Sequence, residues 1–163
     1  IFEKALYPRL SQEVMDLNIE FPLWVCRRPQ RGLKNVLLCV DGSDCSLRAA
    51  EHVGFMMGSE EEHKITLLYV GDGSSTDVEV MFGMVKQKLA NYSIQDACLR
   101  TLVVGEPDVA KTIRKESSRG DYAVVSVGRH GFEDAGAPEN QFLGTRSLEL
   151  VETLERSALW VGN

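Results

Sequence analysis

The residues best suited to carry chemistry lie in a glycine-containing stretch in the last third of the chain. Residues 124–131 read Val-Val-Ser-Val-Gly-Arg-His-Gly, and Gly144-Thr145 follow after twelve further residues. The valines predict a buried strand that stops at a glycine, and an apolar helical pattern begins after Thr145. Glycine lets an anion approach backbone N–H groups, and the first N–H groups of a helix attract it. The stretch therefore predicts a phosphate site, with a plain turn and a threonine N-cap as the alternative explanation.

Composition sets the broad class of the protein. The chain has 163 residues, of which 44% are hydrophobic and 26% charged, as in a soluble globular domain with a sizeable core. Its formal net charge of −6 argues against nucleic acid or an anionic membrane as the main partner. The four cysteines form no CxxC pair and have no histidine at zinc-ligand spacing. This pattern predicts reduced thiols in a cytoplasmic protein without a metal site.

Strand-like and helix-like segments alternate along the chain. Apolar runs predict strands at 21–26, 35–40, 65–70, 97–104, 122–127 and 158–161. Helical periodicity fills the intervals from residue 35 onward, with Asp44 as the expected cap of the first of these helices and Gly58 as its expected end. This alternation predicts an α/β fold with a parallel sheet covered on both faces. Ligands bind such folds outside the carboxyl ends of the strands, where residues 41–43 and 128–131 are expected to meet.

A short repeat relates the two ends of the chain. Residues 23–25 and 159–161 both read Leu-Trp-Val, at an offset of 136 residues, and a helix-like segment precedes each copy. The offset is close to the length of the unit that starts at Leu33. A chance match between two amphipathic segments is the alternative. The repeat predicts that residues 1–32 are the last helix and strand of a preceding copy plus a linker, and that residues 33–163 form the next copy.

Residues 33–163 resemble the universal stress protein domain. The matching motifs are Asn35–Ser43 with Ser46 and Ala50, then Gly105-Glu106-Pro107, Asp121–Val125, Gly128–Gly131 and Gly144-Thr145. Each motif is unspecific alone, but the ordered set is specific. The resemblance implies a three-layer sandwich around a five-stranded parallel sheet, the adenine nucleotide alpha hydrolase-like architecture. It also implies that the last strand is an edge available for antiparallel pairing.

The resemblance further implies an ATP site, with Mg²⁺ as an accompanying ion. Many members of the family bind ATP through Gly-x-x-Gly, nine residues and then Gly-Ser or Gly-Thr. Asp41, Val40 and Val70 would lie at the adenine, and the later glycines around the ribose and phosphates. The nucleotide-binding residues expected on this basis are Val40, Asp41, Gly42, Ser43, Val70, Gly128, Arg129, Gly131, Gly144, Thr145 and Arg146.

The chain departs from the family pattern in the spacer. Twelve residues separate Gly131 from Gly144, and they include Glu133, Asp134 and Glu139. Additional loop length costs little conformational entropy, so the fold tolerates it. The carboxylates, however, would repel a triphosphate.

Three classes of function are compatible with these patterns. The first is an ATP-binding regulatory module of the stress response that signals through nucleotide occupancy and domain pairing. The second is a domain of the same fold that binds no nucleotide and acts in dimerisation or protein interaction. The third is an enzyme, but the sequence has no P-loop, nucleophile elbow or identifiable catalytic base, which leaves at most slow ATP hydrolysis. The expected partner is a second universal stress protein domain, either in tandem or as a homodimer through the last strand.

Overall fold

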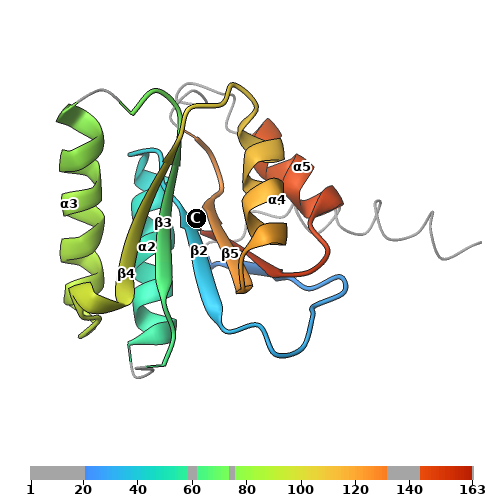
Figure 1. The fold of residues 1–163 in the computed structure, drawn as a ribbon, viewed down its shortest axis with the longest axis horizontal. Helices are drawn as coiled ribbons and strands as arrows, with labels where there is room; N and C mark the ends of the chain where they lie inside the picture. The colour runs from blue at the N-terminus through green and yellow to red at the C-terminus, as the bar shows by residue number, and fades with distance from the viewer. Residues whose placement is uncertain (1–20, 59–61, 74–75, 132–143, 163) are drawn as a thin grey trace, which may run out of the picture.

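The computed structural model describes residues 21–58, 62–73, 76–131 and 144–162, and the predicted helix within residues 1–20 lies outside them. A six-stranded sheet with helices on both sides forms the molecule (Figure 1). Its strands are β1 (Leu23–Val25), β2 (Asn35–Cys39), β3 (Ile65–Val70), β4 (Leu99–Val104), β5 (Tyr122–Gly128) and β6 (Ala158–Gly162). Its helices are α2 (Asp44–Met57), α3 (Thr76–Ala90), α4 (Val109–Arg119), α5 (Thr145–Thr153) and the 3₁₀ turn η1 (Asp96–Cys98). None of these helices is long and apolar enough to cross a bilayer.

The order of the strands fixes where a ligand can bind. It is β1-β6-β5-β2-β3-β4, in which β2 to β6 run parallel and β1 is antiparallel to β6. This confirms the predicted α/β class with five parallel strands. From β2 the chain winds outward through β3 and β4, then crosses back to place β5 on the other side of β2. The carboxyl ends of β2 and β5 therefore flank the switch point of the sheet, where α/β folds bind ligands.

Two apolar cores hold the layers together, one on each face of the sheet. Helices α2 and α3 cover one face and α4 and α5 the other (Figure 1). Successive residues of β2 point to opposite faces, so Val36 and Leu38 pack under α2 and α3 while Leu37 packs under α4 and α5. All three side chains are at most 1% exposed. Strands buried on both faces explain the continuous apolar runs in the sequence.

Of three local predictions, one is confirmed and two need correction. Ser43, not Asp44, is the N-cap of α2, because its hydroxyl oxygen accepts a hydrogen bond from the Ser46 N–H at 3.2 Å. Gly58 is the C-cap of this helix, as predicted; its backbone lies in the right-handed helical region (φ −61°), and a Cβ there would lie 2.5 Å from the Tyr92 carbonyl oxygen. Close packing against Tyr92 therefore accounts for glycine at this position. The strand expected at 97–104 begins with the turn η1 and becomes extended only at Leu99.

The N-terminal described segment is attached to the rest of the chain. Strand β1 is shorter than the predicted 21–26 and pairs with β6, so that Trp24 lies opposite Trp160. The two indole rings stack, with centroids 4.8 Å apart and planes 17° apart. In the linker, the Gln30 N–H donates to the Arg156 carbonyl at 2.8 Å. The Arg27 guanidinium donates to the Glu152 carbonyl at the end of α5.

Candidate functional site

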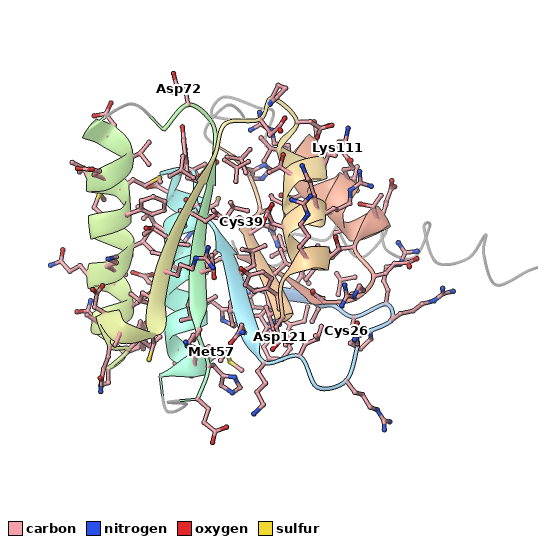
Figure 2. The ribbon with its side chains drawn as sticks, in the orientation of Figure 1. Cys26, Cys39, Met57, Asp72, Lys111 and Asp121 are labelled. Carbon is pink, nitrogen blue, oxygen red and sulfur yellow. The ribbon has the colours of Figure 1, made fainter. Side chains whose placement is uncertain are left out.

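A pocket opens at the switch point of the sheet. About 590 Å³ of space, open solvent at the mouth included, lies between the carboxyl ends of β2, β3 and β5 and the N-terminal halves of α4 and α5. In Figure 2, Asp72 just after β3 marks this end of the sheet, and Asp121 just before β5 marks the opposite end. The lining residues are Cys39, Val40, Asp41, Ser46, Leu68, Val70, Val109, Ile113, Val127, Gly128, His130, Gly131, Arg146, Ser147 and Leu150. A mostly apolar hollow with a few polar groups at its rim is typical of small-molecule sites.

The pocket brings together six of the eleven residues expected from the sequence. These are Val40, Asp41, Val70, Gly128, Gly131 and Arg146. The other five, which do not line it, are Gly42, Ser43, Arg129, Gly144 and Thr145. Segments that are far apart in the chain thus converge as the fold class predicts, but some of the expected residues have supporting positions.

The turn after β2 holds Asp41 in place. The Ser43 N–H donates to Asp41 Oδ1 at 3.0 Å, and the Ser43 hydroxyl donates to the same oxygen at 2.6 Å. Gly42 between them has φ +85°, a backbone conformation that glycine adopts without strain. Because the Ser43 oxygen also caps α2, one residue fixes both the helix start and the carboxylate. Ser43 is therefore a positioning residue for Asp41.

The end of β5 lies unusually close to α2. A Cβ on Gly128 would be 2.8 Å from the Ser46 nitrogen and 2.9 Å from the Cys45 carbonyl carbon. Only glycine lets the strand approach the first turn of the helix this closely. Gly128 also touches the pocket, and its carbonyl accepts a hydrogen bond from the Ser147 hydroxyl at 2.9 Å. Packing against α2 is thus a reason for glycine at this position that no local sequence pattern indicates.

Backbone groups of two expected nucleotide-binding residues, Arg129 and Gly144, connect the loop after β5 to its neighbours. The Arg129 N–H donates to the Gly162 carbonyl at 2.7 Å, and the Arg129 carbonyl accepts from the Gly144 N–H at 2.9 Å. Gly144 is the N-cap residue of α5, and its carbonyl accepts from the Leu148 N–H at 3.1 Å. These bonds fix the start of α5 beside the ends of β5 and β6.

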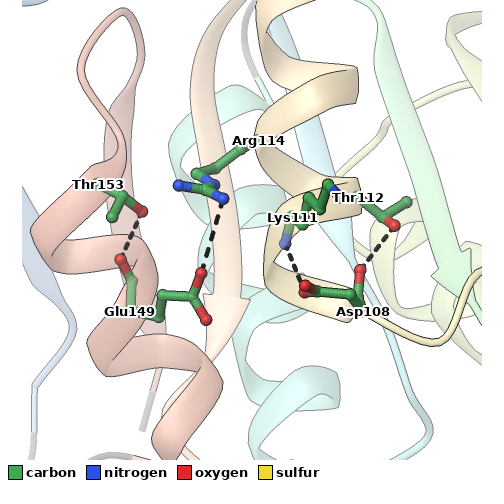
Figure 3. A network of polar contacts seen from close by, with 6 residues as sticks. All are labelled: Asp108, Lys111, Thr112, Arg114, Glu149 and Thr153. Atoms are coloured by element: carbon green, nitrogen blue, oxygen red, sulfur yellow. Dashed lines mark hydrogen bonds and ion pairs between the residues drawn. The ribbon is translucent and has the colours of Figure 1, made fainter.

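The wall of the pocket opposite the sheet is tied together by polar contacts (Figure 3). Asp108 caps α4, because its carboxylate accepts from the Lys111 N–H at 2.9 Å. Arg114 of α4 lies 3.7 Å from the Glu149 carboxylate of α5. The ion pair joins the two helices, whose first turns present Val109 and Arg146 to the pocket.

Few charges face the pocket. Among its lining residues, Asp41 carries a negative charge, Arg146 a positive charge, and His130 an ionisable imidazole. Burial, with the nearby Asp41 charge as a second cause, raises the pKa of the Cys39 thiol, which therefore stays neutral. Arg129 is 4% exposed, and burial lowers the pKa of its guanidinium, although arginine remains protonated at neutral pH. The described residues include no group of three His, Cys, Asp or Glu that could hold a metal ion.

Most of the apolar lining of the pocket, apart from Val40 and Val70, was not predicted from the sequence. The missed lining residues are Cys39, Ser46, Leu68, Val109, Ile113, Val127, His130, Ser147 and Leu150. Their apolar members have the pattern of ordinary core residues, so nothing in the sequence separates them from the rest of the core. His130 and Ser147 could have been found, because each adjoins an expected residue.

Known structures with the same fold were found by comparison, whereas no family model and no curated protein matches the chain. A universal stress protein from Archaeoglobus fulgidus superposes with a TM-score of 0.68 at 15% identity, over 96% of this chain and 56% of that one. A universal stress protein solved in complex with cAMP gives 0.62 at 14% identity, over 79% of this chain and 95% of that one. UspA from Lactobacillus plantarum gives 0.55 at 19% identity, over 80% and 98%. The chain therefore has the universal stress protein fold.

Proposed function

We propose that this chain is an adenine-nucleotide-binding regulatory module of the stress-response type. The observation that carries this proposal is the pocket at the switch point, which Asp41, Val70, Gly131 and Arg146 line together. The neighbour solved with cAMP supports a nucleotide as the ligand class. The resemblance in sequence points to ATP among the adenine nucleotides. The sequence contains no motif that assigns a catalytic base, so the role proposed is binding.

The pocket offers different chemistry at its two sides. Val40 and Val70 present apolar surface to an adenine ring, and the Asp41 carboxylate is an acceptor for its amino group. On the other side, Arg146 lies in the first turn of α5, where a guanidinium and the positive end of the helix dipole favour phosphate. This division suits a ligand with an aromatic base and an anionic end.

Helix α5 provides a physical connection between the pocket and the N-terminal segment. Its first turn contributes Arg146 and Ser147 to the pocket. Its last turn presents the Glu152 carbonyl to Arg27, in the linker that follows β1. A ligand that shifts the first turn therefore acts on a rigid nine-residue helix held at its other end by the segment proposed to belong to the preceding domain. Occupancy and domain pairing are coupled in this proposal through α5.

The proposed partner is a second domain of the same fold. Residues 33–163 make up about 80% of this chain. The neighbour solved with cAMP and UspA are matched over almost their whole length, and they cover 79% and 80% of this chain. The Archaeoglobus fulgidus neighbour is longer, covers 96% of this chain and is itself only 56% covered. This difference supports a tandem arrangement in which residues 1–32 continue a preceding domain. The Leu-Trp-Val of β1 pairs with the Leu-Trp-Val of β6, as two copies related by a local twofold axis would do.

A matched pair of variants tests nucleotide binding. We expect AMP and ATP to bind the intact chain in a calorimetric titration, and Arg146→Ala to weaken AMP about tenfold or more, because it removes the positive side chain at the phosphate end. Arg100→Ala removes the same charge from the exposed outer strand β4, outside the pocket, and is expected to leave the affinity unchanged. Equal affinities for the two variants would refute the proposed phosphate position.

The second candidate is a module of the same fold that binds no nucleotide and serves domain pairing alone. The hydrogen bonds of the Arg129 and Gly144 N–H groups to protein carbonyls favour it, because those donors are already engaged. This alternative would be selected if neither AMP nor ATP gave a binding isotherm while β1 and β6 remained paired.

A further inference from the structure

We propose that the pocket selects adenine nucleotides with a single phosphate and discriminates against the triphosphate. This inference rests on the proposed nucleotide-binding function and specifies its ligand class. Three independent features carry it: the charges that line the pocket, the backbone donors at its rim, and the sequence that joins the two halves of the glycine motif.

The charges on the lining residues nearly cancel. Arg146 is the one lining side chain with a permanent positive charge, and the negative charge of the Asp41 carboxylate offsets it. The Cys39 thiol stays neutral because it is buried. A phosphate monoester carries about −1.5 to −2 at pH 7, and each further phosphate of a nucleotide adds roughly one negative charge. One guanidinium and one helix start match a single phosphate, whereas the outer two phosphates of ATP would meet no described lining cation.

Several hydrogen-bond donors in and beside the pocket are committed to protein acceptors. The Arg129 N–H is bonded to the Gly162 carbonyl, and the Gly144 N–H to the Arg129 carbonyl. The Ser43 N–H and hydroxyl both donate to Asp41, and the Ser147 hydroxyl donates to Gly128. Triphosphate sites of the P-loop type combine several convergent N–H groups with a lysine at the outer phosphates. Freeing these donors would break the bonds that connect β5, β6 and α5, so binding of the outer phosphates carries an additional cost.

The sequence between the two glycine pairs adds negative charge. Residues 132–143 contain Glu133, Asp134 and Glu139 and no lysine or arginine. The segment is joined to Gly131, which lines the pocket, and to Gly144, which caps α5. The three carboxylates add to the negative charge of the chain, which disfavours a ligand in proportion to the ligand's own charge. The penalty is therefore larger for ATP than for AMP.

Calorimetric titration of the intact chain with adenosine, AMP and ATP tests the inference. We expect AMP to bind at least tenfold more tightly than ATP, both with EDTA and with excess Mg²⁺, and adenosine to bind more weakly than AMP. ATP affinity equal to or above that of AMP in either condition would overturn the inference while leaving the proposed function in place. Failure of all three compounds to bind would instead refute the proposed function, and the inference with it.

The variant Asp41→Asn identifies the origin of the selectivity. Asparagine keeps an Oδ1 acceptor for the Ser43 bonds but removes the one carboxylate that lines the pocket. We expect the ratio of ATP to AMP affinity to rise severalfold in this variant, and the ratio in Arg100→Ala to stay at its wild-type value. An unchanged ratio in Asp41→Asn would contradict selection by lining charge, even if both affinities fall together.

Discussion

Replacement of Gly128 by alanine tests whether close packing of β5 on α2 supports the site. The new Cβ would lie 2.8 Å from the Ser46 nitrogen, 2.9 Å from the Cys45 carbonyl carbon and 3.0 Å from the Cys45 Cβ. The first two neighbours are backbone atoms of a helix, so the clash cannot be relieved by rotation of a flexible side chain. Overpacking of this kind destabilises a protein by about 1–3 kcal/mol. The helix start would also shift, and with it the turn that holds Asp41.

A second glycine provides the matched control for this experiment. Gly83 lies within α3, and a Cβ there would meet nothing within 4 Å. Gly83→Ala is therefore expected to stabilise the protein by about 0.5–1 kcal/mol through helix propensity. Urea unfolding followed by circular dichroism measures both variants. Gly128→Ala with an unfolding free energy equal to or above that of the wild type would refute the packing argument, provided that Gly83→Ala behaves as expected.

Two further predictions concern the N-terminal segment. Trp24 Nε1 donates to His52 Nε2 at 3.0 Å, and burial lowers the pKa of His52. Below about pH 6.5 the unfolded chain therefore binds more protons than the folded chain does. His52 should thus contribute stability above about pH 6.5, and this stability should be lost as the pH falls through the lower pKa of the folded state. Thermal unfolding between pH 5 and 8 should show this loss in the wild type and a smaller one in His52→Phe; parallel pH profiles would contradict it. Arg27→Ala should speed hydrogen exchange in β1 relative to the central strands, since the variant removes the contact with the end of α5; unchanged exchange would show that β1 is held by its pairing with β6 alone.

The fold could be predicted from the sequence because its signals are local. The run at 35–40 and the valines at 122–127 are apolar throughout, as strands buried on both faces must be. Alternation with helices then leads to a parallel sheet and a binding edge at the carboxyl ends of the strands. The repeated Leu-Trp-Val likewise indicated two related strands, and β1 and β6 are paired.

The site was predicted less completely because its details depend on contacts between distant segments. The reason for Gly128 lies in the first turn of α2, more than eighty residues earlier, and no local pattern reveals it. The donors on Arg129 and Gly144 are engaged by partners that only the folded chain brings together. Ile113 and Leu150 line the pocket from two helices of the core and carry no mark of that role in the sequence.

The most direct test of the central claim is a backbone amide NMR titration of the intact chain with AMP. The proposal predicts chemical-shift changes concentrated at Asp41, Val70, Gly131 and Arg146, the residues that converge at the switch point. Smaller changes should extend along α5 toward Arg27, which contacts its end. Saturable binding with shifts confined to another surface, or no shifts at millimolar AMP, would contradict a nucleotide site in this pocket.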